Sequence, residues 1–441
     1  MTVSLLYLAV SVVGALFTVV ALRPPRRPIG LVALTFFAAW LATELALVHL
    51  TWQIVATVIF IAFGALDHWV GWLGLAITVA SWVGLASIVA SAWHTDRVFE
   101  TALDDAFGAG WRERANPGDT SPVKVGIEWA RVFLPFHFKR KGVTRVRDLQ
   151  YVDDGRRRHR LDVYRRPDAP PGAPVLLQIH GGGWMIGNKE QQGLPLMYHL
   201  AQRGWVCVAI NYRLSPKATW PDHLVDCKLA IKWLREHIAE YGGDPNYIVV
   251  TGGSAGGHLT AMVGLSANDP EFQPGFEAVD TSVRAMVPFY GIYDWSDRFG
   301  IRGKNDPMLK ALERRIVKAK RADAPDVFDR ASPMHYISPA APPALVVHGV
   351  LDTLAPVQEA REFVRMLREQ SQKPVVYVEL RGAHHAFEIF HSIRSLHTVT
   401  GVDAFLAWVV SVDPPAARAE GAAAARGTEM IDQTTTARTE P

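Results

Sequence analysis

The sequence predicts an α/β protein with a mostly parallel sheet, helices on both faces and a small cap insertion, preceded by an all-α transmembrane domain. Three observations predict this architecture. The first 93 residues are almost free of charge, the remainder alternates short apolar runs with longer amphipathic stretches, and two glycine-rich turns directly follow apolar runs. The first observation is typical of membrane helices, and the other two are typical of a parallel sheet that presents its loops at one edge.

Charge is distributed unevenly along the 441 residues. The chain has 46 Lys+Arg against 43 Asp+Glu, and this balance excludes the dense basic face of a nucleic-acid-binding domain. Residues 1–93 hold only five charges, namely Arg23, Arg26, Arg27, Glu44 and Asp67. The other charges make up about 24% of residues 94–441, which is ordinary for a soluble domain. Two cysteines exclude a disulfide-scaffolded secreted module and a Cys-rich metal site.

The apolar region 1–93 is predicted to be multi-pass, with three or four spans. A helix needs about 20 apolar residues to cross the bilayer. The candidate spans are 2–22, 29–48, 51–66 and 69–93, of which the third is short. Three arginines between the first two spans favour a cytoplasmic loop and an outside N-terminus. If the chain crosses the membrane three times, its remainder lies in the cytoplasm, and if it crosses four times, its remainder lies outside. The basic residues that follow the spans favour the cytoplasm.

Glu44 is the one acidic residue within a candidate span. An intramembrane carboxylate often carries protons or substrates. No second ionisable residue accompanies Glu44 in its span, so we expect it to lie near the end of a span or to face a neighbouring helix.

Residues 94–145 are predicted to connect the two domains. Residues 123–141 combine aromatic with basic side chains, and they either lie along the membrane surface, as an interfacial or lid segment, or pack over the core of the next domain. Residues 413–441, after that domain, are rich in Ala, Thr and Arg without periodicity, which predicts a disordered tail.

Residues 146–412 carry the alternating pattern of the α/β domain. Short apolar runs between turn residues predict strands at 175–179, 206–210, 247–251, 285–290, 344–347 and 375–380. Amphipathic stretches predict helices at 221–241, 257–268, 356–370 and 391–410. Residues 293–332 interrupt this alternation with a charged segment, which we interpret as a cap insertion of this domain.

Ser254 has the sequence context of a nucleophile elbow. It stands in Gly252-Gly253-Ser254-Ala255-Gly256, between a predicted strand and a predicted helix. In a G-x-S-x-G turn the serine backbone is strained, and only small neighbours leave its hydroxyl clear at the edge of the sheet. The strand and helix on either side favour a nucleophile over an ordinary glycine-rich turn.

A second turn, His180-Gly181-Gly182-Gly183-Trp184, directly follows the strand at 175–179. Acyl transfer passes through a tetrahedral oxyanion that backbone N–H groups must meet, and glycines permit that exposed backbone. We therefore predict an oxyanion hole formed by the N–H groups of Gly182, Gly183 and Ala255. His180 is expected to brace the loop, and Trp184 to shape the pocket.

With these two motifs, the chain resembles the hormone-sensitive-lipase-like branch of the α/β-hydrolases and its acetyl-xylan/feruloyl-esterase-like and arylformamidase-like neighbours. The resemblance covers about residues 145–410 and includes Asn211–Pro216, Tyr241–Pro245 and His348–Asp352. It implies an α/β-hydrolase fold, short to medium acyl chains and no cofactor. The chain departs from the family at Gly253, where that branch commonly has an acidic residue.

A nucleophilic serine needs a base and an orienting carboxylate. Chain order in this fold is Ser, then Asp or Glu, then His, which selects Asp352 after the strand at 344–347. Asp294 and Asp226 are weaker candidates, since one opens the cap and the other lies inside a helix. The resemblance to the family's His-x-Phe turn selects His385 over His384 as the base.

These residues predict a membrane-anchored serine carboxylesterase or lipase-like hydrolase. The expected partners are a small-molecule or lipid ester and the membrane lipids, without nucleic acid. No metal is expected, because the histidines lack the spacing and the carboxylate ligand of a hydrolytic zinc site. Two alternatives remain at this point: an arylformamidase-like amidase with the same triad, and a membrane sensor whose hydrolase-like domain only binds ligand.

Overall fold

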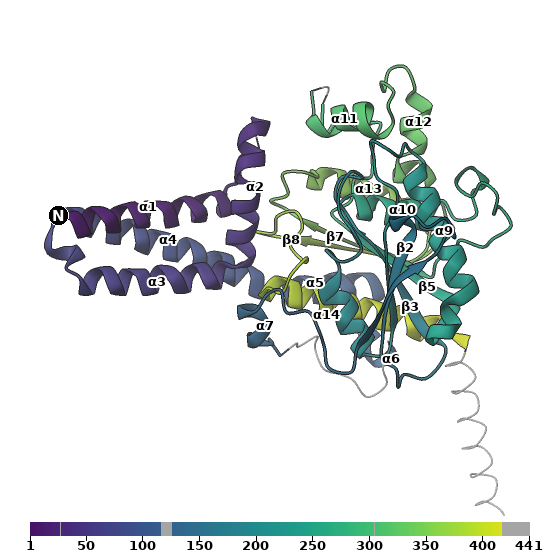
Figure 1. The fold of residues 1–441 in the computed structure, drawn as a ribbon, viewed down its shortest axis with the longest axis horizontal. Coiled ribbons are helices and arrows are strands. Elements are labelled where there is room, and N and C mark those ends of the chain that lie inside the picture. Colours follow the sequence, from purple (N-terminus) through teal and green to yellow (C-terminus); the bar gives the residue numbers. More distant parts are fainter. Residues whose placement is uncertain (27, 116–125, 304, 417–441) are drawn as a thin grey trace, which may run out of the picture.

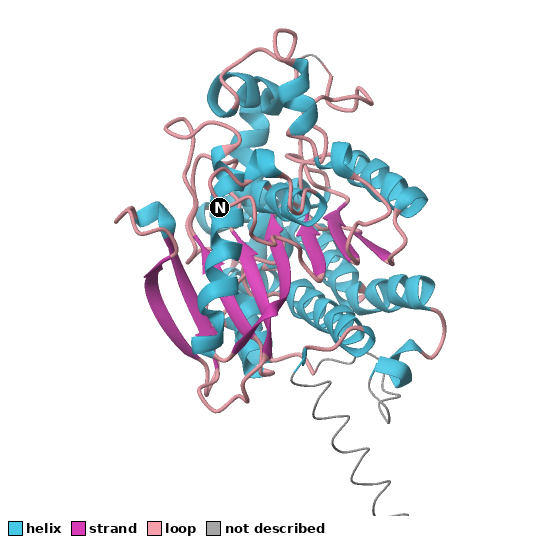
Figure 2. Cartoon of the chain, turned by 90° about the vertical axis from the view of Figure 1, so that its right-hand side faces the viewer, coloured by secondary structure: helices cyan, strands magenta, loops and turns pink. Residues whose placement is uncertain are grey.

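The computed structural model describes residues 1–26, 28–115, 126–303 and 305–416. Its α/β domain is built on one eight-stranded sheet with the order β1-β2-β4-β3-β5-β6-β7-β8 (Figure 2). Strands β3 to β8 run parallel, while β1 and β2 form an antiparallel edge. The strands are β1 (Thr144–Gln150), β2 (Arg160–Arg165), β3 (Ala173–Ile179), β4 (Val206–Ile210), β5 (Gly243–Gly253), β6 (Ala285–Phe289), β7 (Ala344–Gly349) and β8 (Val375–Leu380).

Helices cover both faces of the sheet. Alternate residues of the central strands enter two separate cores, as Val175 and Leu176 do. One core holds α9 (Asp222–His237), α10 (Ala255–Leu265) and α13 (Val357–Gln370), and the other holds α5 (Thr95–Phe107), α6 (Trp111–Ala115), α8 (Leu194–Gln202) and α14 (Ile393–Val412). The predicted α/β class with helices on both faces is therefore confirmed.

The residues between β6 and β7 include two short helices beyond the sheet edge, α11 (Pro307–Ala311) and α12 (Pro325–Arg330) (Figure 1). They fall within the segment that the sequence analysis interprets as a cap. The first two strands and α8 were not predicted. Strand β1 is half-exposed and charged, with two arginines and an aspartate, so it lacks the continuous apolar run of a central strand.

The N-terminal helices form a bundle that projects from the α/β domain (Figure 1). Helices α1 (Thr2–Leu22), α3 (Ala46–Ala62) and α4 (Trp69–Trp93) run side by side, whereas α2 (Ile29–Glu44) lies across the end of the bundle nearest the sheet. The chain turns by 86° between α2 and α3. The expected spans 29–48 and 51–66 are thus wrong in their bounds, because the break falls at Leu45 and α2 does not run along the bundle.

Among the described residues, three helical stretches have the length and composition to cross a membrane, or four if α2 and α3 count as one bent span. They are Thr2–Leu22, Trp69–Phe107 and Ile393–Val412. The last is α14, which lies buried against the sheet of the α/β domain. The N-terminus lies at the far tip of the bundle, so the loop between α1 and α2 is on the side of the α/β domain (Figure 1).

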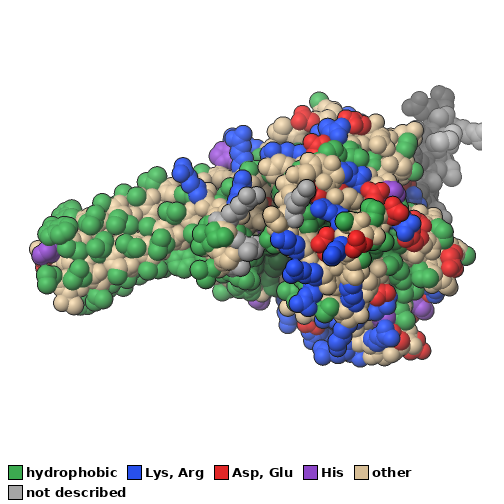
Figure 3. Space-filling model, turned by 90° about the horizontal axis from the view of Figure 1, so that it is seen from above, with side chains coloured by type: hydrophobic (Ala, Val, Ile, Leu, Met, Phe, Trp, Pro, Cys, Tyr) green, Lys and Arg blue, Asp and Glu red, His purple; other side chains and the backbone are tan. Residues whose placement is uncertain are grey.

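The bundle has polar side chains inside and apolar side chains outside. The Tyr7 hydroxyl donates to Thr57 Oγ1 (3.3 Å), and Thr18 and Ser81 share a hydrogen bond of 2.7 Å, all between buried side chains. Figure 3 shows the outer surface covered by hydrophobic side chains, while charged side chains gather on the α/β domain. This distribution is the reverse of a water-soluble helical bundle.

Residues 94–145, which connect the bundle to the sheet, are partly buried and partly exposed. Helix α5 continues from α4 and packs on the sheet, and Val132 of α7 (Trp129–Phe133) is buried against Ala92 and Ile393. Trp129 and Phe136 remain exposed. Residues 116–125 and the tail from residue 417, which was predicted to be disordered, lie outside the described residues.

Candidate active site

Ser254 stands between the end of β5 and the start of α10, at the carboxyl edge of the parallel strands. Its φ of 60° and ψ of −122° lie in a region that non-glycine residues rarely adopt. The Ser254 N–H donates to Phe289 O of the neighbouring strand (3.0 Å), which holds this conformation. The turn therefore has the strained geometry of a nucleophile elbow.

The loop at 180–184 lies directly against this serine. A Cβ on Gly181 would lie 3.1 Å from Ser254 Cβ and 2.5 Å from Gly253 O, so only glycine permits this approach. Gly182 has a φ of +110°, and a Cβ there would lie 2.2 Å from Ile186 O. Ala255 is the first residue of α10, where backbone N–H groups have no partner within the helix. Gly181 thus adjoins Ser254, Gly182 and Gly183 are the next two residues of the same loop, and Ala255 follows Ser254 in the chain.

The other motif residues are structural. Gly252 and Gly256 let the elbow pack on β3, since a Cβ on either would lie within 2.4 Å of Ile179 O. The buried His180 ring stacks on Tyr212 at 4.3 Å, and burial lowers the pKa of His180 to about 4, so it is neutral. Trp184 is wholly buried and packs on Trp295, at the start of the segment between β6 and β7.

His385 and Asp352 form a buried pair on the loops that follow β8 and β7. His385 Nδ1 lies 2.6 Å from Asp352 Oδ2. The N–H groups of Leu354 and Ala355 both donate to Asp352 Oδ1 at 2.8 Å. A carboxylate only accepts, so Nδ1 carries the hydrogen and Nε2 is left free to act as a base.

The charge of Asp352 is well stabilised. Burial alone would raise the pKa of its carboxyl group, but the neighbouring His385 and a hydrogen bond from His348 hold it well below its ordinary value. The carboxylate is therefore ionised at every pH at which a protein of this kind would work.

Tyr290 connects the serine turn to the histidine. Its ring lies 4.5 Å from the His385 ring, and its hydroxyl donates to the buried Glu388 carboxylate at 2.5 Å. A Cβ on Gly253 would lie 2.5 Å from the Tyr290 hydroxyl oxygen, so Tyr290 occupies the space that a side chain at position 253 would need. The departure from the family at Gly253 thus has a steric reason.

Tyr290 and Glu388 were not predicted from the sequence. The one sign in the sequence was an acidic residue three positions after His385 in an otherwise apolar turn. Burial raises the pKa of Glu388 to about 7, against the lowering effect of the Tyr290 hydrogen bond.

The weaker candidates for the acid and the base have other partners. Asp226 accepts hydrogen bonds from the backbone and side chain of Arg213, and Asp294 does the same from Arg298. His384 Nε2 lies 2.8 Å from Ala21 O of α1. Of the two adjacent histidines, only His385 contacts Asp352 in the described residues.

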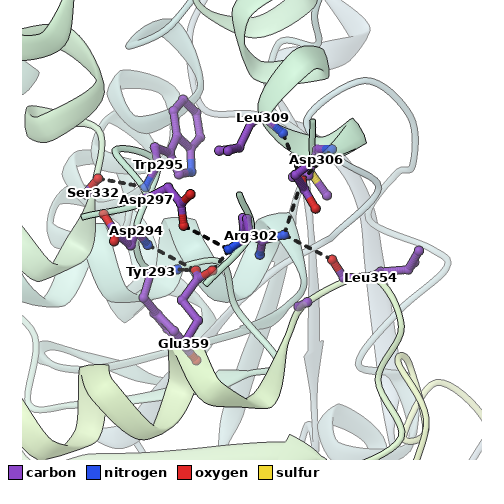
Figure 4. A network of polar contacts seen from close by, with 12 residues as sticks. Tyr293, Asp294, Trp295, Asp297, Arg302, Asp306, Leu309, Ser332, Leu354 and Glu359 are labelled. Carbon is purple, nitrogen blue, oxygen red and sulfur yellow. Dashed lines mark hydrogen bonds and ion pairs between the residues drawn. The ribbon is translucent and has the colours of Figure 1, made fainter. Parts of the chain in front are cut away.

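Asp294 instead belongs to the polar network that attaches the segment between β6 and β7 to α13 (Figure 4). Glu359 accepts from the N–H groups of Tyr293 and Asp294 at 2.5 and 3.1 Å and from Arg302 Nε at 2.8 Å. Arg302 Nη1 also donates to Leu354 O (3.4 Å), which is two residues from Asp352. Among the described residues, no group of three or more His, Cys, Asp or Glu side chains is arranged to hold a metal.

Comparison with known proteins agrees with this geometry. The family model BD-FAE matches residues 161–367. The probable carboxylic ester hydrolase LipM of Mycobacterium tuberculosis is 42% identical over 91% of this chain and 93% of LipM. The chain belongs to the carboxylic ester hydrolases of the α/β-hydrolase fold. Esterase LipQ of the same organism is 41% identical to this esterase, over 72% of the chain and 75% of LipQ.

A solved esterase structure gives the same fold. Est2 of Thermogutta terrifontis matches with a TM-score of 0.51 and 26% identity, over 65% of this esterase and 98% of Est2. The LipM match also covers part of the N-terminal region. Residues 144–441, from the start of β1 onward, are only about two thirds of this esterase, so a match over 91% of it must include N-terminal helices. Since these relatives are enzymes, they argue against the sensor alternative.

Proposed function

We propose that this esterase is a membrane-anchored serine carboxylesterase that cleaves esters of short to medium acyl chains through Ser254, Asp352 and His385. The observation that carries the proposal is the buried 2.6 Å contact between His385 and Asp352 at the sheet edge that also bears the strained Ser254.

In this mechanism His385 Nε2 takes the hydroxyl proton as Ser254 Oγ attacks the ester carbonyl. The N–H groups of Gly182, Gly183 and Ala255 stabilise the oxyanion. The alcohol leaves with the proton from His385, and the acyl group stays on Ser254. Water, activated by the same histidine, then releases the acid and restores the serine. Asp352 keeps the ring oriented throughout.

The bundle supports the membrane anchor. Its apolar exterior and polar interior suit a lipid environment. Helix α2 lies across the base of the bundle, where the bilayer surface would be, with Leu34 78% and Phe37 63% exposed. Trp129 and Phe136 expose further aromatic surface near α7, at the same junction. Membrane lipids, or an ester dissolved among them, would contact these side chains.

The direction of the bundle favours a cytoplasmic α/β domain. With α1, α3 and α4 as three spans, the loop that contains Arg23 and Arg26 is on the same side as the α/β domain. Basic loops stay preferentially in the cytoplasm.

Ser254→Ala in the full chain tests the chemistry. We expect p-nitrophenyl butyrate hydrolysis and fluorophosphonate labelling to disappear, while Ser411→Ala, an exposed serine at the end of α14, keeps both. Formyl-anilide substrates assayed in parallel separate an esterase from an amidase of the arylformamidase type. Retained ester hydrolysis in folded Ser254→Ala would refute the assignment.

Cysteine labelling in intact cells tests the topology. Both native cysteines, Cys207 and Cys227, are buried, so background labelling should be low. An impermeant maleimide should label Thr2→Cys in intact cells and Asp168→Cys only after lysis. Labelling of Asp168→Cys in intact cells would place the α/β domain outside.

A further inference from the structure

The loop that carries His385, residues 381–392 between β8 and α14, is held by the N-terminal helices. Three helices of the bundle region each make a hydrogen bond to it. Helix α1 contributes Ala21 O, which lies 2.8 Å from His384 Nε2. Helix α4 contributes the Ser91 hydroxyl, which donates to Arg381 O (2.7 Å). Helix α2 contributes the Trp40 indole N–H, which donates to Ala386 O (2.9 Å).

Two of these contacts fall on the direct neighbours of His385. Ala386 has a φ of +66°, a conformation that costs free energy in a residue with a side chain and persists only where its surroundings hold it. Its carbonyl is the one that Trp40 binds. The Phe36 ring, one turn earlier on α2, lies 6.4 Å from the His385 ring. Helix α2 therefore contacts both the histidine and the strained residue beside it.

A buried ion pair reinforces this contact at the other end of the loop. Glu44, the last residue of α2, accepts from Arg394 Nε (3.0 Å) and from the Ser392 hydroxyl (2.7 Å). Both charged side chains are 1% exposed. Arg394 Nη1 in turn donates to Arg381 O (2.9 Å), so the pair links the start and the end of the loop.

We infer that Trp40 and Glu44 are positioning residues for His385, so that the N-terminal helical domain forms a structural part of the active site. This inference rests on the proposed role of His385 as the base. A base must be held within a fraction of an ångström of its productive place, and a displacement of about 1 Å can cost about 100-fold in rate. The contacts from α2 supply that constraint from outside the α/β domain.

Substitutions on α2 in the full chain test the inference. Trp40→Phe keeps an aromatic ring opposite Phe390 but removes the indole N–H together with the pyrrole part of the indole. We expect kcat for p-nitrophenyl butyrate to fall about 5- to 50-fold, with KM within about twofold, and the fluorophosphonate labelling rate of Ser254 to fall with kcat. Thr35→Ala on the same helix is the matched control, because its hydroxyl donates to Leu31 O of its own helix.

Glu44→Gln gives an independent measurement. It leaves Arg394 without its charged partner, and we expect kcat to fall about 10- to 100-fold together with a lower melting temperature. The double variant Glu44→Gln/Arg394→Gln has no unpaired buried charge, so its melting temperature should recover while kcat stays low. Recovery of kcat along with stability would show that the ion pair is merely structural.

Folded Trp40→Phe with wild-type kcat and wild-type labelling rate would overturn the inference, and this variant decides it alone if Glu44→Gln does not fold. Failure of the proposed function gives a different result, since Ser254→Ala would then retain activity whatever the α2 variants do.

Discussion

Gly253→Ala tests the packing between the serine turn and the histidine. The new Cβ would lie 2.5 Å from the Tyr290 hydroxyl oxygen and 2.8 Å from two of its ring carbons. Non-bonded carbon atoms normally stay about 3.5–4.0 Å apart, so the ring must retreat by about 1 Å. It has little room to do so, because Tyr290 is 1% exposed, its hydroxyl is bound to Glu388, and His385 and Phe387 pack on it.

Inserting a methyl group into such a site costs about 1–3 kcal/mol. For a domain of this size that corresponds to a fall of roughly 2–5 °C in the melting temperature. Because the displaced ring lies against His385, kcat should fall as well. Two measurements check this prediction, namely thermal unfolding of the full chain in detergent and hydrolysis of a p-nitrophenyl ester.

Gly126→Ala is the matched control, since a Cβ there has no atom of the described residues within 4 Å and should leave both quantities unchanged. A melting temperature of Gly253→Ala within 1 °C of wild type would refute the steric explanation for this glycine. In that case the absence of the family's acidic residue would need another cause.

Three further predictions follow from the buried charges. Asp352→Asn should lower kcat by about 10³- to 10⁴-fold with little loss of stability, because an amide no longer selects the tautomer with hydrogen on Nδ1 of His385. A smaller fall in kcat in steady-state assays would argue against Asp352 as the orienting acid. Burial raises the pKa of Glu388 to about 7, so the folded chain keeps a proton that the unfolded chain has lost, and stability falls as pH rises toward and through 7. Glu388→Gln should remove up to about 3 kcal/mol of that decline, and an unchanged slope of stability against pH in urea titrations would contradict it. Arg302→Met leaves Glu359 buried without its cation and should cost about 3–5 kcal/mol in denaturant unfolding, whereas a loss below about 1 kcal/mol would show that the network of Figure 4 contributes little.

Much of the fold follows from local sequence patterns. The central parallel strands β3 and β4 are nearly continuous apolar runs because both of their faces are buried, and such runs can be recognised without any knowledge of their partners. Strand β1 escaped prediction because an exposed edge strand has no such run, and β2 escaped it because Arg160, Asp162 and Arg165 interrupt its apolar residues. The break at Leu45 escaped it as well, because no glycine or proline marks the turn and Glu44 is the one charged residue beside it.

The residues of the proposed site likewise fall into those that local sequence revealed and those that only the fold brought together. The glycines around Ser254 and at 181–183 could be found in the sequence because the strain and the close backbone approaches that they permit belong to short turns. The pairing of His385 with Asp352 was anticipated from chain order and from the resemblance to a family. The Tyr290–Glu388 contact was not, since it joins residues 98 positions apart.

The sequence by itself therefore determined two things about this protein. An N-terminal region almost free of charge precedes an α/β domain, and that domain has a serine and a glycine loop at the ends of its strands. Only the tertiary structure decided that Glu44 meets Arg394 and that Trp40 holds the residue after His385. Local periodicity reports which face of an element is buried, whereas the partner of a buried polar group depends on how distant elements pack, and these partners are about 350 residues apart.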